Sequence, residues 1–152
     1  MRTAKQLSIT LLNKPGRMTA VLHAFSKAKV NILALAVMDS DGRGRLRLIV
    51  DEPKRAGDEL AALNLSYDTS DVLLAEMPHQ PGAFGKICQR LADEHLNIDY
   101  AYSSFGPAKG SRNGAFAVVK VNDLAKAQRV LGEATTHGQR GRRPGRRPVH
   151  AR

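Results

Sequence analysis

Hydrophobic residues in the first half of the chain recur with two different periods. Residues 7–12 and 45–50 read LSITLL and RLRLIV, alternating apolar with polar side chains as half-buried strands do. Between them, apolar residues three and four positions apart predict one helical face, formed by Met18, Val21, Leu22, Phe25 and Ala28. The pattern predicts a strand–helix–strand–strand–helix–strand order, with strands at 7–12, 31–38 and 45–50 and a weak one at 65–68.

Turn and cap residues punctuate these elements. Asp41-Gly42 predicts a tight hairpin turn between the second and third strands. Asp51-Glu52-Pro53 predicts the start of the second helix, with an acidic cap and proline in the first turn. Gly57 is a weak point in that helix, because glycine disfavours helix interiors.

The same pattern occurs a second time in the chain. At an offset of 66 residues Pro15-Gly16 matches Pro81-Gly82, and similar residues follow at matching positions. These pairs include Met18 with Phe84, Val21 with Ile87, Leu22 with Cys88, Phe25 with Leu91, Asn31 with Asn97 and Ile32 with Ile98. The offset later grows to 71, and the second copy has predicted strands at 71–77, 97–105 and 115–121 and a last helix capped by Asp123. Two βαββαβ units predict an α+β, ferredoxin-like fold, with antiparallel sheets that each carry helices on one face.

We therefore predict a first domain at 5–69, a second at 70–134 and a tail at 135–152. The chain carries 24 Lys and Arg against 14 Asp and Glu, a net charge of +10. Six of the arginines and none of the acids lie in 137–152, so the tail is predicted to be disordered and basic. No alternating apolar strand follows the last helix, so the second unit lacks its own closing strand, or a reading-frame shift has replaced its natural end. The sheet edges left exposed lead us to expect a homodimer.

Composition favours a cytoplasmic protein that does not enter a membrane. The chain has one cysteine, which excludes an intramolecular disulfide and fits a reducing compartment. The longest apolar run, VNILALAVM at 30–38, is too short to span a bilayer.

Catalytic and metal motifs fail on spacing. DSDGRGR at 39–45 opens like a calcium loop, but its twelfth position is Val50 instead of a glutamate. GPAKGS at 106–111 has the residues of a phosphate loop in the wrong order. Cys88 lies on a predicted apolar helix face, which favours a buried, inert thiol. We therefore expect no enzyme activity, no cofactor and no metal.

Nucleic-acid binding has limited support in the sequence. RNA-recognition domains share the βαββαβ order and stack bases on aromatics of their two central strands. The corresponding strands here contain one aromatic residue, Phe116, so RNA stacking on the sheet is unfavourable. The basic tail is the remaining candidate, through phosphate contacts.

The Pro-Gly loops are the strongest candidate site. A strand that turns into a helix through glycine exposes backbone N–H groups at the helix N-terminus, where they attract a carboxylate or phosphate. An ordinary tight connection is the better explanation of one such loop taken alone, and an asparagine after the helix, at Asn31 or Asn97, is also typical of a left-handed helix end.

The stretches LNKPGRMTAVLHAFSKAKVNI and MPHQPGAFGKICQRLADEHLNI resemble the opening of ACT domains, small regulatory modules that sense amino acids. Both copies carry the resemblance, which covers roughly residues 5–134 and indicates a stand-alone tandem ACT protein. It implies that units pack side by side into an eight-stranded sheet, with amino acids bound at the seam between units.

Carried over position by position, the resemblance places a ligand between the loop of one unit and the second-strand start of another. One seam would join Asn13, Lys14, Pro15, Gly16, Arg17 and Met18 to Asn97 and Ile98. The other would join His79, Gln80, Pro81, Gly82, Ala83 and Phe84 to Asn31 and Ile32. His79 departs from the amide side chain at Asn13 and introduces a group that can titrate near neutral pH, so the first loop is expected to be the better site.

The resemblance implies a non-catalytic regulatory protein that binds an amino acid and passes that state to a partner, a metabolic enzyme or another regulator. One alternative is a regulatory subunit of an amino-acid biosynthetic enzyme, similar to the small subunit of acetolactate synthase. The other is a nucleic-acid-binding regulator that uses the basic tail, with steeply salt-dependent affinity.

Overall fold

The computed structural model describes residues 2–106 and 114–137, with side chains up to Gly132. The elements of the first half are β1 (Arg2–Leu12), α1 (Arg17–Lys27), β2 (Ile32–Ser40), β3 (Arg43–Val50) and α2 (Pro53–Ala62). Those of the second half are β4 (Tyr67–Pro78), α3 (Ala83–Asp93), β5 (Ile98–Ser103), β6 (Gly114–Val121) and α4 (Leu124–His137). The predicted basic tail lies outside the described residues from position 138 onward.

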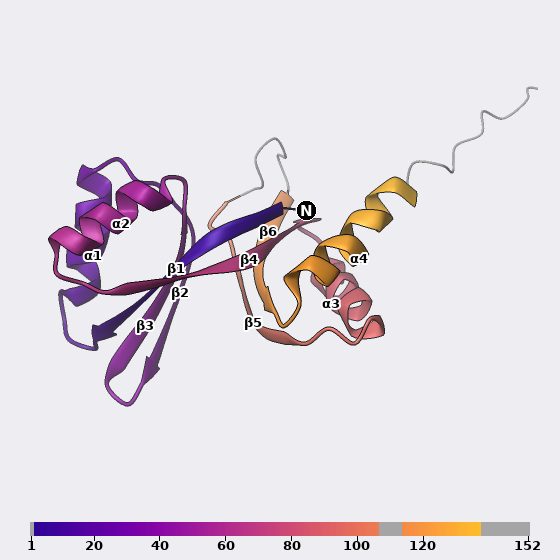
Figure 1. Cartoon of the computed structure of the whole chain (residues 1–152), viewed down its shortest axis with the longest axis horizontal. Coiled ribbons are helices and arrows are strands. Elements are labelled where there is room, and N and C mark those ends of the chain that lie inside the picture. Colours follow the sequence, from indigo (N-terminus) through magenta and orange to yellow (C-terminus); the bar gives the residue numbers. More distant parts are fainter. Residues whose placement is uncertain (1, 107–113, 138–152) are drawn as a thin grey trace, which may run out of the picture.

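The strands form one antiparallel, six-stranded sheet in the order β2-β3-β1-β4-β6-β5. Figure 1 shows α1 with α2 at one end of the molecule and α3 with α4 at the other, with the strands between them. The predicted α+β architecture of two βαββαβ units is confirmed. The two units share one continuous six-stranded sheet, whereas the repeat pattern predicted a sheet for each unit and the resemblance implied an eight-stranded one.

Two long strands are shared between the units. β4 runs without a break from Tyr67 to Pro78, so it contains both the weak fourth strand of the first unit and the first strand of the second. β1 begins at Arg2, five residues before its predicted start at position 7. Its residues 2–5 pair with residues 71–74 of β4. The N-terminal residues therefore occupy the closing position that the sequence of the second unit leaves empty.

The pairing of β1 with β4 has approximate twofold symmetry. The residues that match Arg2 and Leu74 in the other copy, 66 positions away, are Asp68 and Ser8, and these two also pair with each other. Lys5 and Asp71 are paired and match each other at the same offset. Lys5 and Asp71 therefore lie on the pseudo-twofold axis. Their side chains form an ion pair, with Lys5 Nζ 2.8 Å from Asp71 Oδ1.

Each unit packs its helix pair against one face of the sheet, and a third core lies on the opposite face. In the first unit Val21, Phe25 and Leu60 pack against β1 and β3, and in the second Ile87 and Leu91 pack against β4 and β6. The third cluster consists of Ala34, Ile49, Val72, Leu74, Phe116 and Val118.

This third core exists because the sheet curls until its two edge strands meet. Ala34 of β2 forms an isolated antiparallel bridge with Ser104, just beyond β5. The Phe105 N–H donates to the Leu33 carbonyl at 3.0 Å. Phe116, the one aromatic candidate for base stacking, is therefore 5% exposed inside the curl.

Several local predictions are confirmed and others are wrong. Asp41 and Gly42 both have positive φ in the hairpin turn, and Asp123 Oδ1 accepts from the Lys126 N–H at 2.9 Å as a helix cap. The N-cap residue of α2 is the acidic Glu52, but its side chain makes no capping hydrogen bond, and the Asp51 carboxylate instead accepts from the Asn31 N–H at 2.8 Å. Met18 is 39% exposed and lies at the rim of the helix face instead of in the core.

Candidate functional site

Both Pro-Gly loops have the same backbone geometry. Gly16 and Gly82 are the N-cap residues of α1 and α3, and their φ values of 86° and 80° lie in the left-handed region that favours glycine. Neither helix has a side-chain cap. Within the described chain, the N–H groups of Met18 and Thr19 in the first turn of α1 have no acceptor. This helix end therefore offers free donors, favourably placed in the helix dipole, to a bound anion.

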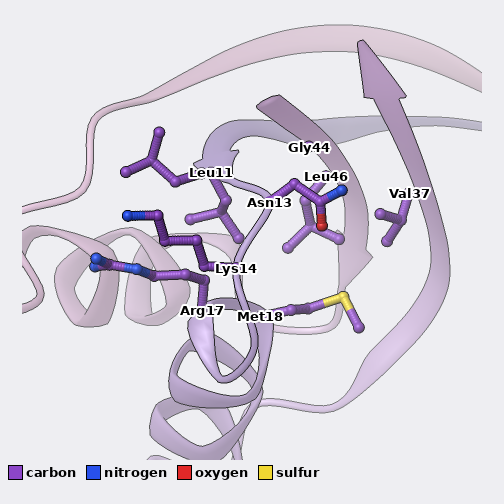
Figure 2. Close-up of a pocket in the computed structure, with 9 residues that line it drawn as sticks. Leu11, Asn13, Lys14, Arg17, Met18, Val37, Gly44 and Leu46 are labelled. Atoms are coloured by element: carbon purple, nitrogen blue, oxygen red, sulfur yellow. The ribbon is translucent and has the colours of Figure 1, made fainter. Parts of the chain in front are cut away.

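A small pocket lies beside the first loop. It has a volume of about 150 Å³ and extends from the loop across the ends of β2 and β3. Its lining residues are Leu11, Leu12, Asn13, Lys14, Arg17, Met18, Val37, Gly44 and Leu46. In Figure 2 Asn13, Met18, Val37 and Leu46 lie on one side of the loop, and Lys14 and Arg17 extend together on the other side.

The pocket is apolar at its rim and positively charged on one flank. Leu12, Met18 and Val37 are 49%, 39% and 48% exposed, so this rim meets solvent in the single chain. Lys14 and Arg17 supply two positive charges, whereas the equivalent positions of the second loop are Gln80 and Ala83. The two loops therefore share a backbone and differ in charge, and the first is the better match for an anionic group.

The two Asn-Ile entries also share a geometry. The Asn31 N–H donates to Asp51 Oδ1 and the Asn31 carbonyl accepts from the Asp51 N–H at 3.1 Å. Asn97 makes the same pair of contacts with Asn122, at 3.0 and 3.3 Å. Neither asparagine has positive φ, so the interpretation as a left-handed helix end is wrong at these positions. Lys29 and His95, two residues earlier, have the positive φ.

The predicted seam residues do not come together within one chain. All the residues that line the pocket beside Asn13 belong to the first unit, and Asn97 and Ile98 are not among them. In Figure 1 the connection from β1 to α1 lies at the left of the molecule, whereas the connection from α3 to β5 lies at the right. The second loop, from His79 to Phe84, follows β4 and belongs to the second unit. Asn31 and Ile32 precede or begin β2 and belong to the first unit.

A buried polar cluster on the helix-free face was not predicted. Gln6 is 0% exposed, and its Nε2 donates to Tyr100 Oη at 2.7 Å while its Oε1 accepts from Tyr102 Oη at 2.8 Å. The Arg47 guanidinium lies 4.0 Å from the centre of the Tyr100 ring. Burial raises the pKa of the Tyr102 phenol above its ordinary value, Tyr100 raises this pKa further, and Arg47 opposes the rise.

Other chemistry has little structural support. Among residues 2–106 and 114–132 no three His, Cys, Asp or Glu side chains gather as metal ligands would. Cys88 is half-buried, like its counterpart Leu22. In the described part of the chain, every helix is too short or too polar to cross a bilayer.

Comparison with known proteins gives one family and several similar structures. The family model that matches residues 2–134 describes an ACT domain pair. A crystal structure of a protein from Bacteroides thetaiotaomicron has a TM-score of 0.78 and 34% identity, covering 88% of this chain and 89% of that chain. No curated protein sequence matches.

Two more distant structures share the fold. The ligand-free regulatory subunit of aspartate kinase from Thermus thermophilus has a TM-score of 0.60 and 14% identity, covering 87% of this chain and 91% of that chain. The corresponding subunit from Thermus flavus has a TM-score of 0.56 and 14% identity, covering 88% and 92%.

Proposed function

Because the chain belongs to the ACT domain family, as a pair of ACT units, we propose that it binds an amino acid at a seam between units and regulates a partner. ACT domain pairs are regulatory, non-catalytic modules, so no reaction is assigned to this chain. The ligand would lie against the first loop, with its carboxylate on the free N–H groups of α1 and its ammonium on the Asn13 amide oxygen.

The observation that carries this proposal is the first loop itself. It combines a left-handed glycine, free helix N–H donors and two positive charges beside an apolar pocket. The free donors and the cations suit a carboxylate, and the apolar rim suits a side chain. The second loop shares the glycine but lacks the cations, so we expect weaker binding there.

The seam requires a second copy of the chain. The pocket volume of about 150 Å³ is well below the roughly 300–1,000 Å³ typical of small-molecule sites, so one chain forms only part of a site. The exposed side chains of Leu12, Met18 and Val37 line this half-site. A partner subunit that covers them would bring its own Asn97 region to the loop and form a homodimer.

Thermal-shift measurements with each of the twenty amino acids test the proposal. At least one amino acid is expected to raise the melting temperature, because it binds the folded state. Gly16→Val should reduce this shift, since valine does not tolerate the left-handed backbone that the loop needs. Gly82→Val is the matched control, because it introduces the same backbone strain at the weaker loop and should leave the shift in place.

Asn97→Ala tests the partner side of the seam and should reduce the shift without changing the fold of the first loop. Sedimentation velocity should show a ligand-strengthened dimer. A shift of unchanged size for every amino acid in both Gly16→Val and Asn97→Ala would exclude the seam. A catalytic subunit that co-purifies with the chain would identify the regulated partner as a biosynthetic enzyme, and we expect both in the cytoplasm.

A further inference from the structure

A second cavity, larger than the first, lies inside the curl of the sheet. Its volume is about 600 Å³, within the range of about 300–1,000 Å³ typical of small-molecule sites. It is lined by Arg2, Thr3, Ala4, Leu33, Ile49, Val50, Asp51, Leu74 and Phe116. Its lining comes from both units and includes no residue of either Pro-Gly loop.

The floor of this cavity is apolar and already buried. Ile49, Leu74 and Phe116 are 1%, 2% and 5% exposed and belong to the core cluster of the helix-free face. Leu33 is half-buried, and its carbonyl is held by the Phe105 N–H that joins the two sheet edges. These side chains leave little area exposed, so an apolar group that enters the cavity gains mainly by losing its own contact with water.

The mouth carries two opposite charges. Arg2 and Asp51 both line the cavity and are both exposed. Among the described side chains Asp51 has no ion pair, and Arg2 has only a long one, with its Nε 3.9 Å from Glu76 Oε1. Arg2 and Asp51 therefore do not neutralise each other, and each keeps its charge for a ligand at the mouth.

We propose that this cavity is a second binding site within one chain, for a small zwitterion with an apolar side chain. The carboxylate of the ligand pairs with Arg2, its ammonium pairs with Asp51, and its side chain lies on Ile49, Leu74 and Phe116. The site is complete without a second copy of the chain, and it does not depend on the proposed seam.

Occupation of the cavity is linked to the N-terminal strand. Arg2, Thr3 and Ala4 line the cavity only while they are paired with residues 72–74 of β4. A ligand that contacts both Arg2 and the Leu74 floor stabilises this pairing. Binding at the cavity therefore slows amide exchange in residues 2–4 and 72–74, whereas binding at the first loop does not.

Isothermal titration with L-leucine, 4-methylpentanoate and 3-methylbutylamine tests the ligand class, because the two analogues each lack one charge. Leucine is expected to bind, and each analogue about tenfold or more weakly, since each loses one charge-assisted contact. Hydrogen exchange is measured on the same samples. Absence of binding by leucine, or equal affinity for all three compounds, would overturn the proposal.

Three variants separate recognition from structural effects. Asp51→Asn keeps an oxygen acceptor for the Asn31 N–H but removes the negative charge, and Arg2→Gln removes the positive charge. Each of these two substitutions should weaken the binding of leucine about tenfold. Glu76→Gln is the control, because it removes the ion-pair partner of Arg2 and should leave the affinity unchanged or higher.

A loss of affinity in Glu76→Gln as large as that in Arg2→Gln would assign Arg2 a structural role and overturn the proposal. If Gly16→Val abolishes leucine binding and Asp51→Asn does not change it, the seam holds all of the ligand and the cavity holds none. If Asp51→Asn weakens leucine binding about tenfold and Gly16→Val does not change it, the cavity proposal stands and the proposed seam fails.

Discussion

Tyr102 and Gln6 show how much a single hydrogen-bonded pair can depend on the whole fold. Gln6 is fully buried, yet its side-chain amide has partners on β5 and β4, including Ser70 Oγ at 3.4 Å. A buried amide without these partners would cost roughly 1–3 kcal/mol. The cluster therefore fixes how the β5 edge curls over β1.

Tyr102→Phe should lower the free energy of unfolding by about 1–3 kcal/mol at pH 7, because Gln6 Oε1 loses its donor inside the protein. Urea denaturation followed by circular dichroism measures the change. Tyr67→Phe is the control, since Tyr67 is 38% exposed and its hydroxyl has no hydrogen bond among the described residues, and a change below about 0.5 kcal/mol is expected. Equal effects in the two variants would contradict the role of the cluster.

The same residue predicts an alkaline effect. Because folding raises the pKa of Tyr102, its neutral form is favoured in the folded state. This contribution is complete below the ordinary pKa of about 10 and is lost as the pH rises above that value. The stability difference between wild type and Tyr102→Phe should therefore shrink between pH 9 and pH 11. A constant difference in denaturation curves over this range would contradict the pKa shift.

Local sequence signals predict some residues here and miss others. The positive φ of Gly16 and Gly82 was predictable, because each glycine stands in a strand-to-helix turn. Gly57 lacks a side chain for a reason that local sequence does not reveal, because a Cβ there would lie 2.3 Å from Tyr67 Oη, ten residues further along the chain. Gln6, Tyr100 and Tyr102 carry no local signal, because their contacts join strands more than 90 residues apart.

At the scale of elements, β1 and β4 each serve both units. The second half of β1 is the first strand of the first unit, and residues 2–5 are the closing strand of the second. The first half of β4 is the closing strand of the first unit, and its second half is the first strand of the second. The sequence predicts the apolar half of β1 by its alternation. The polar stretch RTAK at 2–5 has no such pattern, because its strand conformation comes from pairing with a distant segment.

Deletion of residues 2–4 should uncover the edge of β4 in the second unit. Amide exchange at 72–74 is expected to rise strongly, because these residues lose their antiparallel neighbour. Exchange mass spectrometry measures this change, and peptides from the centre of α1 give an internal reference that should not change. Unaltered protection at 72–74 would show that another segment closes the unit.

At the scale of the molecule, the two units share one sheet and one core. The helix-free core draws Ala34 and Ile49 from the first unit and Leu74, Phe116 and Val118 from the second. The sequence predicts both βαββαβ units and both Pro-Gly loops, because these arise from local periodicity and turns. It does not predict the curl or the inner cavity, since both depend on contacts between the two edges of the sheet.

Separation of the chain between residues 69 and 70 should therefore give fragments that do not unfold cooperatively alone. Each would expose part of the shared sheet and half of the third core. After equimolar mixing of the two fragments, circular dichroism is expected to show one thermal transition again. A monomeric 70–152 fragment that melts like the intact chain would show that the units are independent.

The ion pair of Lys5 with Asp71 has a consequence for any protein built from a repeated unit. In a dimer of identical subunits, a residue on the twofold axis faces its own copy, so a charged side chain there meets the same charge. Fusing the two copies into one polypeptide removes this restriction, and lysine can then face aspartate across the axis at 2.8 Å. The pair is exposed and worth at most about 1 kcal/mol, but it makes the two halves chemically distinguishable at their shared centre. Each half can then specialise, as the different charges of the two Pro-Gly loops already show.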